Sequence, residues 1–158
     1  MTTRRRPGFS LPEILIGLAL FGILLVAMRV FFFWNRSAIN SMEKTNLAAK
    51  LRNSSIILNR SLALATEFLY PATIGPDYVH QIIFRNRDNH IVGIFLNDKN
   101  TLSMYNYSTD EFRDITPFTI GFKGRRVKQN LMEYQIDIKK DQFQFSIQNQ
   151  LSTCNTLP

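Results

Sequence analysis

One acidic residue, Glu13, directly precedes the most apolar stretch of the chain. Residues 14–27 carry no charged side chain, and an ionisable group beside such a run is expensive to bury and usually functional. Ser10 lies three residues before Glu13, which is the spacing of a capping box, in which the acid accepts a hydrogen bond from the Ser10 amide. Glu13 therefore has two interpretations: a helix cap, or a charge that requires a partner.

The bond between Gly8 and Phe9 offers a source for that partner. Cleavage after Gly8 would free the ammonium group of Phe9, four residues before Glu13. Inside a bundle of apolar helices, Glu13 of one subunit would neutralise the Phe9 ammonium of its neighbour, so that neither charge is left unpaired. Under this hypothesis the pair helps to set the axial register between subunits.

The element that must position Glu13 is the apolar segment after it. As a helix, residues 14–34 would rise about 31 Å, the thickness of a hydrocarbon core. Arg29 interrupts the segment near its far end, where its stem can lie along apolar surface while the guanidinium reaches the headgroups. Residues 31–34, Phe-Phe-Phe-Trp, suit the aromatic belt of the membrane interface. We predict a membrane-spanning helix over residues 9–34.

The flanking charges predict the orientation of this helix. Arg4, Arg5 and Arg6 precede it and few cations follow directly, which places the amino terminus in the cytoplasm and the bulk of the protein outside it. A cleaved secretory signal would end in small residues, whereas this run ends in aromatic ones. A plain signal anchor fits the hydropathy but leaves the order of residues 8–13 unexplained.

The run Gly8-Phe9-Ser10-Leu11-Pro12-Glu13, followed by an apolar helix, resembles the prepilin-type cleavage and methylation motif of type IV pilins and type II secretion pseudopilins. The resemblance implies that a membrane prepilin peptidase and methyltransferase cuts after Gly8 and methylates the amino group of Phe9. It also implies that Glu13 serves subunit assembly. Other pilin or pseudopilin subunits and inner-membrane lipid are then the expected partners.

Two departures from that family's pattern refine the expectation. Pro12 replaces the usual aliphatic residue before the acid, although the first turn of a helix tolerates proline. A carboxy-terminal cysteine pair is missing, since Cys154 is the only cysteine. Both features favour a minor pilin or pseudopilin. Gly22 falls where many members carry a helix-loosening glycine.

The net charge of +7 arises partly from the predicted leader, residues 1–8. Its removal leaves 16 basic against 12 acidic side chains, an excess that is ordinary for a soluble domain and gives little support to charge-driven nucleic-acid binding. With one cysteine, no intrachain disulfide can form. The exported part must therefore be stabilised by packing.

Beyond residue 34 the helix is expected to continue to residue 70, before Pro71. An apolar stripe at three-and-four spacing supports this, and it comprises Leu47, Leu51, Ser54, Leu58, Leu62, Ala65 and Leu69. Residues 71–158 are expected to form an exported domain with strands at 79–85, 91–96, 102–107, 115–122, 132–138 and 143–147. Turns are expected at 88–89, 98–100, 124 and 140–141. The predicted fold is α+β, a long helix packed on an antiparallel sheet.

Side chains with catalytic or metal-binding chemistry do not form a recognisable motif. His80 and His90 are the only histidines, and they show no metal-ligand spacing with each other or with Cys154. Asp110, Glu111 and Asp114 could form a small cation site, but they are expected instead to solubilise a loop. The sequence also has no Gly-rich phosphate loop and no Gly-x-Ser-x-Gly motif. We therefore expect neither enzymatic activity nor a cofactor.

A basic segment, Lys123, Arg125, Arg126 and Lys128, is expected at a hairpin tip. It could contact DNA or anionic lipid, but it lacks the interleaved aromatic residues that favour single-strand binding, so a solvated turn is preferred. Three functions follow: a structural subunit of a type IV pilus or type II secretion pseudopilus, a DNA- or surface-binding minor pilin, and a single-pass anchored protein such as an enzyme. The first is favoured, in the inner membrane, with the carboxy-terminal domain periplasmic or extracellular.

Overall fold

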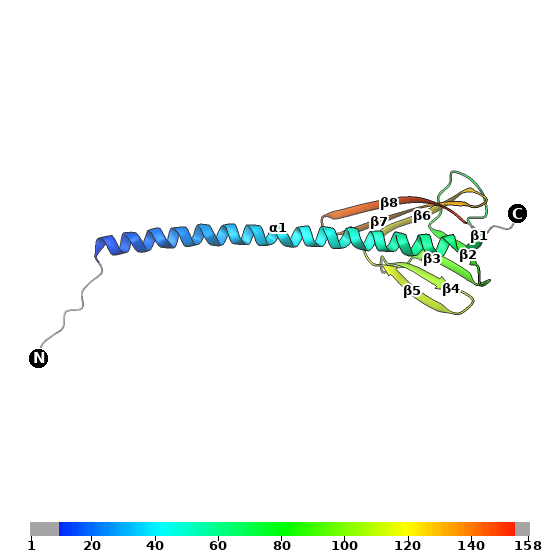
Figure 1. Ribbon diagram of the computed structural model, residues 1–158, viewed down its shortest axis with the longest axis horizontal. Helices are drawn as coiled ribbons and strands as arrows, with labels where there is room; N and C mark the ends of the chain where they lie inside the picture. The colour runs from blue at the N-terminus through cyan, green and yellow to red at the C-terminus, as the bar shows by residue number, and fades with distance from the viewer. Residues whose placement is uncertain (1–9, 154–158) are drawn as a thin grey trace, which may run out of the picture. The chain divides into compact units, whose positions relative to one another are not determined.

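The computed structural model describes residues 10–153, which form one helix and eight strands (Figure 1). The helix α1 spans Leu11–Ala63. The strands are β1 (Ala65–Tyr70), β2 (Gln81–Asn86), β3 (Ile91–Leu96), β4 (Leu102–Asn106), β5 (Glu111–Thr116), β6 (Thr119–Lys128), β7 (Leu131–Lys140) and β8 (Phe143–Ser152). The chain divides into two compact units, residues 1–43 and 44–158.

The strands of the second unit form two antiparallel sheets. One has the order β1-β2-β3-β4-β5 and the other the order β6-β7-β8, so every strand pairs with its neighbour in sequence. The last part of α1, from residue 44, belongs to the same unit. This arrangement is the predicted α+β class, a helix packed on antiparallel sheet.

The core of the second unit lies between the apolar stripe of α1 and the two sheets. Leu47, Leu51, Leu58 and Leu62 of the helix are all buried, as the three-and-four spacing predicts. They belong to one cluster with strand residues that include Phe84, Ile82, Ile94, Leu102, Phe122, Tyr134, Ile136 and Ile138. Burying this set supplies the main stabilisation, since each such side chain contributes about 1.5–3 kcal/mol.

Tyr134 joins the helix to the three-stranded sheet. Its hydroxyl lies 3.0 Å from the Ser55 hydroxyl and donates to Asn59 Oδ1 at 2.8 Å. The side chain is fully buried, and these bonds satisfy its hydroxyl group, which would otherwise be an unpaired polar group in the core. On β7 the predicted alternation holds, with Tyr134, Ile136 and Ile138 all pointing inward.

The prediction that the helix continues to residue 70 is wrong. The helix ends at Ala63, and residues 65–70 form β1, which pairs with β2. A register shift between Ala65 and Glu67 places Ala65 and Phe68 on the same buried side although they lie three residues apart. In this bulged strand the buried residues therefore have the three-residue spacing that is typical of one face of a helix.

The single strand predicted at 115–122 is also wrong. It is broken by Pro117 and Phe118, so that β5 ends one sheet and β6 begins the other. Proline has no N–H for a strand ladder, and Phe118 has a φ of 64°, a left-handed conformation that ends an extended run. Of the other strands, β3 matches its predicted bounds, β2 begins two residues late, and β8 continues to Ser152.

Gly124 was expected to form a turn, but it lies within β6. A Cβ atom at this position would stand 2.6 Å from Cδ1 of the buried Ile82 on β2. Gly124 and Val79 also exchange two backbone hydrogen bonds of 2.8 Å. The glycine therefore permits the close approach of β2 and of the segment before it to β6.

A buried carboxylate, Glu133, links the elements around the three-stranded sheet. Its side chain is 1% exposed and forms a two-pronged ion pair with Arg125 of β6, Nε to Oε1 and Nη2 to Oε2, both at 3.0 Å. The Tyr78 hydroxyl and the amide groups of Gln148 and Gln150 also donate to it. Four donors thus satisfy one buried charge.

This cluster makes stability depend on acidity. The bonds from Arg125 and then Tyr78 hold the pKa of Glu133 at about 2, below its ordinary 4.5. The stabilisation is therefore complete above about pH 4.5 and is lost as the pH falls toward 2. It amounts to about 3 kcal/mol in the free energy of unfolding.

We expect Glu133→Gln to lower the free energy of unfolding by about 3 kcal/mol at pH 7 and to flatten its fall between pH 4.5 and 2. Urea unfolding of the detergent-solubilised protein, followed by near-ultraviolet circular dichroism, measures both effects. Asp141→Asn, in the exposed turn before β8, is the control and should retain the wild-type slope. An unchanged slope in Glu133→Gln would show that another group governs the acid response.

We expect Gly124→Ala to destabilise the protein by about 1–3 kcal/mol, because the new methyl group collides with Ile82. Ile82→Val removes the nearest atom, so the double variant should lose less stability than the two single losses added together. Gly75→Ala is the control, since a Cβ there meets no atom within 4 Å. The same unfolding measurement checks all four proteins, and strict additivity would exclude the proposed collision.

Candidate assembly site

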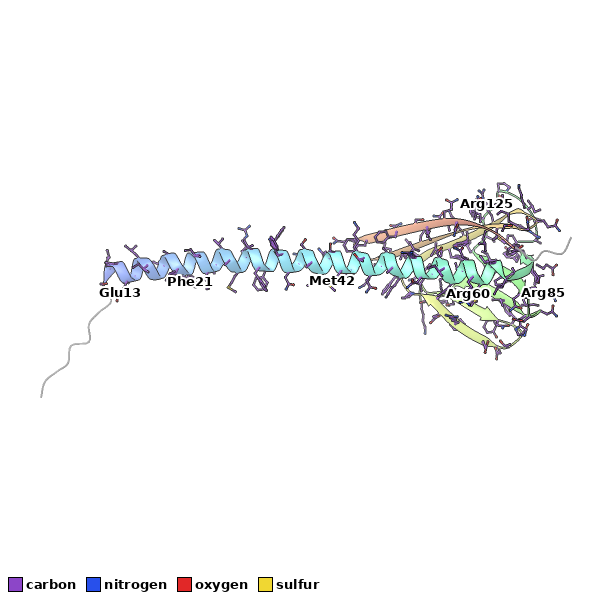
Figure 2. The ribbon with its side chains drawn as sticks, viewed as in Figure 1. Glu13, Phe21, Met42, Arg60, Arg85 and Arg125 are labelled. Carbon is purple, nitrogen blue, oxygen red and sulfur yellow. The ribbon has the colours of Figure 1, made fainter. Side chains whose placement is uncertain are left out.

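Glu13 lies in the first turn of α1, where it caps the helix (Figure 2). Its Oε2 atom accepts the Ser10 N–H at 2.9 Å and the Ser10 hydroxyl at 3.0 Å. The amide of Glu13 in turn donates to the Ser10 carbonyl at 3.0 Å. The contact from the acid to the Ser10 amide is the one that the capping-box spacing predicts. Gly8 and Phe9, the predicted cleavage site, lie outside the described residues.

The helix that follows Glu13 is apolar on all sides and exposed in the single chain. Its large side chains between residues 14 and 34 are roughly half to three-quarters exposed, among them Phe21 at 58% and Trp34 at 73%. A helix that is hydrophobic all round requires an apolar environment, and so large an exposed apolar surface marks a site of interaction with membrane or protein.

Within residues 10–153, α1 is the helix long and apolar enough to cross a membrane, with a mean hydropathy of 2.6 over its most apolar window. Arg29 shares a shallow hollow with Val26, Val30, Phe33 and Trp34, which agrees with the prediction that its stem lies along apolar surface. Gly17 and Gly22 face open space, since a Cβ at either would meet nothing within 4 Å.

The basic residues predicted at a hairpin tip lie instead along β6. Arg125 pairs with Glu133, and the Arg126 guanidinium donates to the carbonyls of Phe68, Ala72 and Gln129 at 2.9–3.3 Å. Lys123 and Arg125 each lie 4.8 Å from the centre of the Tyr78 ring. Lys128 is exposed at the end of the strand. Three of the four cations therefore make contacts inside the domain.

The candidate metal ligands are dispersed in the structure. Asp110 accepts the Tyr105 hydroxyl, and Asp114 accepts the Ser103 hydroxyl at 2.8 Å. Glu111 accepts the Thr109 hydroxyl at 3.0 Å. Over residues 10–153, no group of three histidine, cysteine or acidic side chains is arranged to hold a metal ion.

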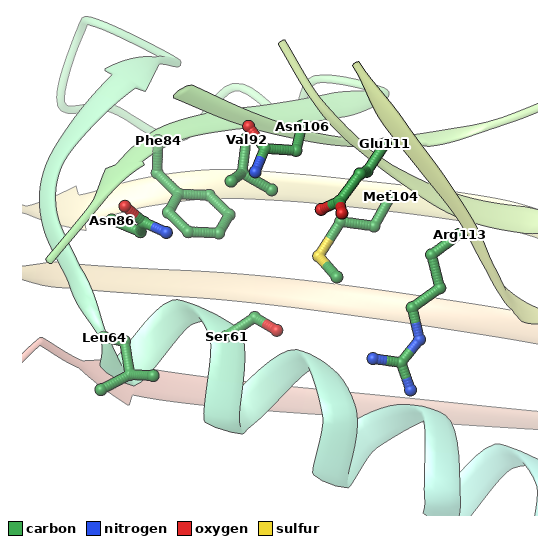
Figure 3. Close-up of a pocket in the computed structure, with 9 residues that line it drawn as sticks. All are labelled: Ser61, Leu64, Phe84, Asn86, Val92, Met104, Asn106, Glu111 and Arg113. Carbon is green, nitrogen blue, oxygen red and sulfur yellow. The ribbon is translucent and has the colours of Figure 1, made fainter. Parts of the chain in front are cut away.

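A cleft of about 270 Å³ opens between the end of α1 and the five-stranded sheet (Figure 3). Leu64, Phe84, Val92 and Met104 form its apolar part, while polar groups come from Ser61, Asn86, Asn106, Glu111 and Arg113. Glu111 and Arg113 lie two residues apart on β5, so their side chains point to the same side of the strand, and both line the cleft. No sequence pattern predicts this cleft, because it depends on the distance between β5 and the helix.

Sequence reasoning also missed Glu133. The alternation of Tyr134, Ile136 and Ile138 places residue 133 on the outward face, where a charged side chain is normally solvated. Its burial results from Tyr78, Arg125, Gln148 and Gln150, which come from three other segments. The sequence pattern of β7 alone does not predict that these residues cover Glu133.

Comparison with known proteins identifies one family motif. The prokaryotic N-terminal methylation motif matches residues 3–28, the span that contains Gly8, Phe9, Glu13 and residues 14–28 of the apolar segment. No curated protein and no solved structure matches the chain. The matched motif, together with the exposed apolar helix that follows Glu13, supports the resemblance of this chain to type IV pilins and pseudopilins.

Proposed function

We propose that the protein is a minor pilin or pseudopilin, a structural subunit of a type IV pilus or type II secretion pseudopilus. The family motif supports a pilin-like subunit. The observation that carries the finer proposal is the position of Glu13, a carboxylate in the first turn of a helix that is apolar on every side. A filament core built from such helices buries their apolar surface and requires that each buried charge be paired.

Cleavage after Gly8 makes the required positive charge. The bond is cut by prepilin peptidase, and the new amino group of Phe9, once methylated, keeps its proton and its charge at neutral pH. Glu13 of one subunit pairs with the Phe9 ammonium of the next inside the helix bundle. In a low-dielectric setting this pairing favours one axial register, because any other leaves two charges without partners.

The helix cap and the pairing can coexist on one carboxylate. Both hydrogen bonds from Ser10 go to Oε2 of Glu13, and no described residue donates a hydrogen bond to Oε1. An ionised carboxylate offers about four acceptor positions over its two oxygens. Ser10 therefore orients the group while Oε1 stays available to the ammonium of a neighbour.

The protein sits in the inner membrane as a single-pass subunit before assembly. Three arginines at residues 4–6 keep the amino terminus in the cytoplasm, and the second unit is carried to the periplasmic or extracellular side. The alternative of a DNA-binding pilin draws less support from the structure. Arg125 is committed to Glu133 and Arg126 to backbone carbonyls, which reduces the charge available to a phosphate backbone.

The mature amino terminus tests the processing step. Mass spectrometry of the protein from membranes should find a chain that begins with N-methyl-Phe9. Replacing Gly8 with a bulky residue such as leucine should leave the leader attached. An intact Met1 in the wild-type protein, or a cut beyond Trp34, would refute the precursor proposal.

Two substitutions separate the cap from the charge. Glu13→Gln keeps an acceptor for the Ser10 amide, since Gln also serves a capping box, but it removes the negative charge. Ser10→Ala removes one hydrogen bond to Glu13 and keeps the charge. We expect Glu13→Gln to reduce incorporation into sheared filaments at least tenfold and Ser10→Ala to reduce it less than twofold.

The readout is the amount of mature protein in the filament fraction relative to the membrane fraction, measured by immunoblotting. Equal membrane levels of both variants show that export and anchoring are intact. If Ser10→Ala fails as severely as Glu13→Gln, the acid acts through the cap rather than through a neighbour.

A further inference from the structure

The two sheets have four outer strands, β1, β5, β6 and β8. An outer strand presents a row of backbone N–H and C=O groups that can pair with another chain. Proteins prevent this with charged residues, proline, bulges or a covering segment. The four edges of this domain differ sharply in such protection.

The edges of β6 and β1 are covered from within the chain. The segment before β2 lies along β6, where Val79 and Gly124 exchange two hydrogen bonds and the Gly75 amide donates to the Arg126 carbonyl at 3.1 Å. On β1, the Arg126 guanidinium donates to the Phe68 carbonyl at 3.3 Å. Both pairings at these edges also contain register shifts.

The edge of β8 has none of these devices. Its ten residues pair with β7 without any register shift, and its sequence contains no charged residue and no proline. Over residues 10–153, β7 is the strand with which β8 pairs. Every second side chain faces solvent, and these are Gln144, Ser146, Gln148, Gln150 and Ser152.

The edge of β5 is the second one that no described segment covers, although β5 carries Glu111, Arg113 and Asp114 and its pairing with β4 contains a register shift. Four consecutive residues, Glu111 to Asp114, are exposed, so neither face of this part of the strand is covered by the described chain. Phe112 is 55% exposed, and it lies on the face opposite Glu111 and Arg113, which line the cleft (Figure 3). An exposed aromatic side chain on an open edge is a feature of surfaces that bind a partner.

The two open edges run in opposite directions. Phe143, the first residue of β8, pairs with Lys140, and both Lys140 and Lys50 lie within 5.7 Å of the centre of the Phe118 ring. Farther along β8, Asn149 donates to Asn59 at 3.1 Å. β8 therefore runs parallel to α1. β5 begins at Glu111, which lines the cleft with Ser61, and leads to Phe118 beside Lys50. It therefore runs antiparallel to α1, as the arrows in Figure 1 show.

We propose that β8 of one copy of this chain pairs with β5 of the next copy, as adjacent antiparallel strands. The inference rests on the proposed filament function, because subunits that enter a filament from one membrane share one polarity. In such copies two β8 strands, or two β5 strands, run parallel to each other, whereas β8 and β5 run antiparallel. The contact uses two different edges, so it is heterologous, and it joins copies of this chain that stand next to each other in the filament.

The chemistry of the two edges fits this pairing. β8 offers uncharged amides and hydroxyls, so it places no like charge beside Glu111 or Arg113. Copies of the same orientation keep α1 on the same side of both strands. Ser146, which points away from the core, then lies on the same face as Phe112, whereas Glu111 and Arg113 lie on the helix side.

Paired cysteines in the full-length protein test the contact. In a Cys154→Ser background, Ser146→Cys is combined with Phe112→Cys, with Glu111→Cys or with Arg113→Cys, and membranes that assemble the filament are treated with a mild oxidant. We expect the pair 146 and 112 to form a ladder of covalent multimers, at least fivefold above the pairs with 111 or 113, because side chains alternate between the faces of a strand. The control pair Ser146→Cys and Lys128→Cys uses the covered β6 edge and should give no ladder.

Other outcomes overturn the proposal. A dimer from Ser146→Cys alone means that β8 pairs with itself, and a covalent adduct of that variant with a different protein means that the partner is another chain. The absence of a ladder from every pair excludes the contact. The amino terminus and filament content of the same samples separate this failure from failure of the proposed function, since normal N-methyl-Phe9 and incorporation leave the pilin assignment intact.

Discussion

The structure depends on a helix whose apolar side chains are not covered by any other part of residues 10–153. From residue 14 to residue 34, α1 exposes leucine, isoleucine, valine and aromatic groups on all sides, and water disfavours such a surface strongly. The protein therefore requires an external apolar environment, first a bilayer and then, in the proposed filament, the helices of neighbouring subunits. The family motif over residues 3–28 agrees with this requirement.

An apolar environment raises the energetic cost of each charge near the helix that has no partner. Glu13 is tolerated because it lies in the first turn, where Ser10 binds it and the helix dipole favours an acid. Arg29 stands near the other end of the segment, where a long side chain can reach an interface. A charged side chain midway between Glu13 and Arg29 would have neither a helix cap nor an interface within reach. Residues 14–27 contain no charged side chain.

The second unit is stabilised by different means. With one cysteine in the sequence, it depends on the leucine stripe of α1, the inward faces of the strands and two buried polar contacts. Tyr134 connects the helix to β7, and Glu133, on the opposite face of the same strand, connects β6, β8 and the segment that carries Tyr78. The two faces of β7 therefore hold the layers of the domain together.

The sequence alone predicted the elements whose residues repeat with a clear period. The apolar span, the acid at its border, the leucine stripe to Leu62 and the alternation of Tyr134, Ile136 and Ile138 are local patterns, and hydrophobic burial acts on them directly. The α+β class follows from their order.

Only the tertiary structure decided the features that depend on distant neighbours. The bulged pairing of β1 with β2 converted a helix-like spacing into a strand, and the division into two sheets separated β5 from β6 at Phe118. Glu133 is buried because three other segments cover it, and β8 is open because no described segment does. The hydrophobic period and the composition of a segment describe the element to which a residue belongs. Whether that residue is buried or exposed depends on segments that lie far away in the sequence.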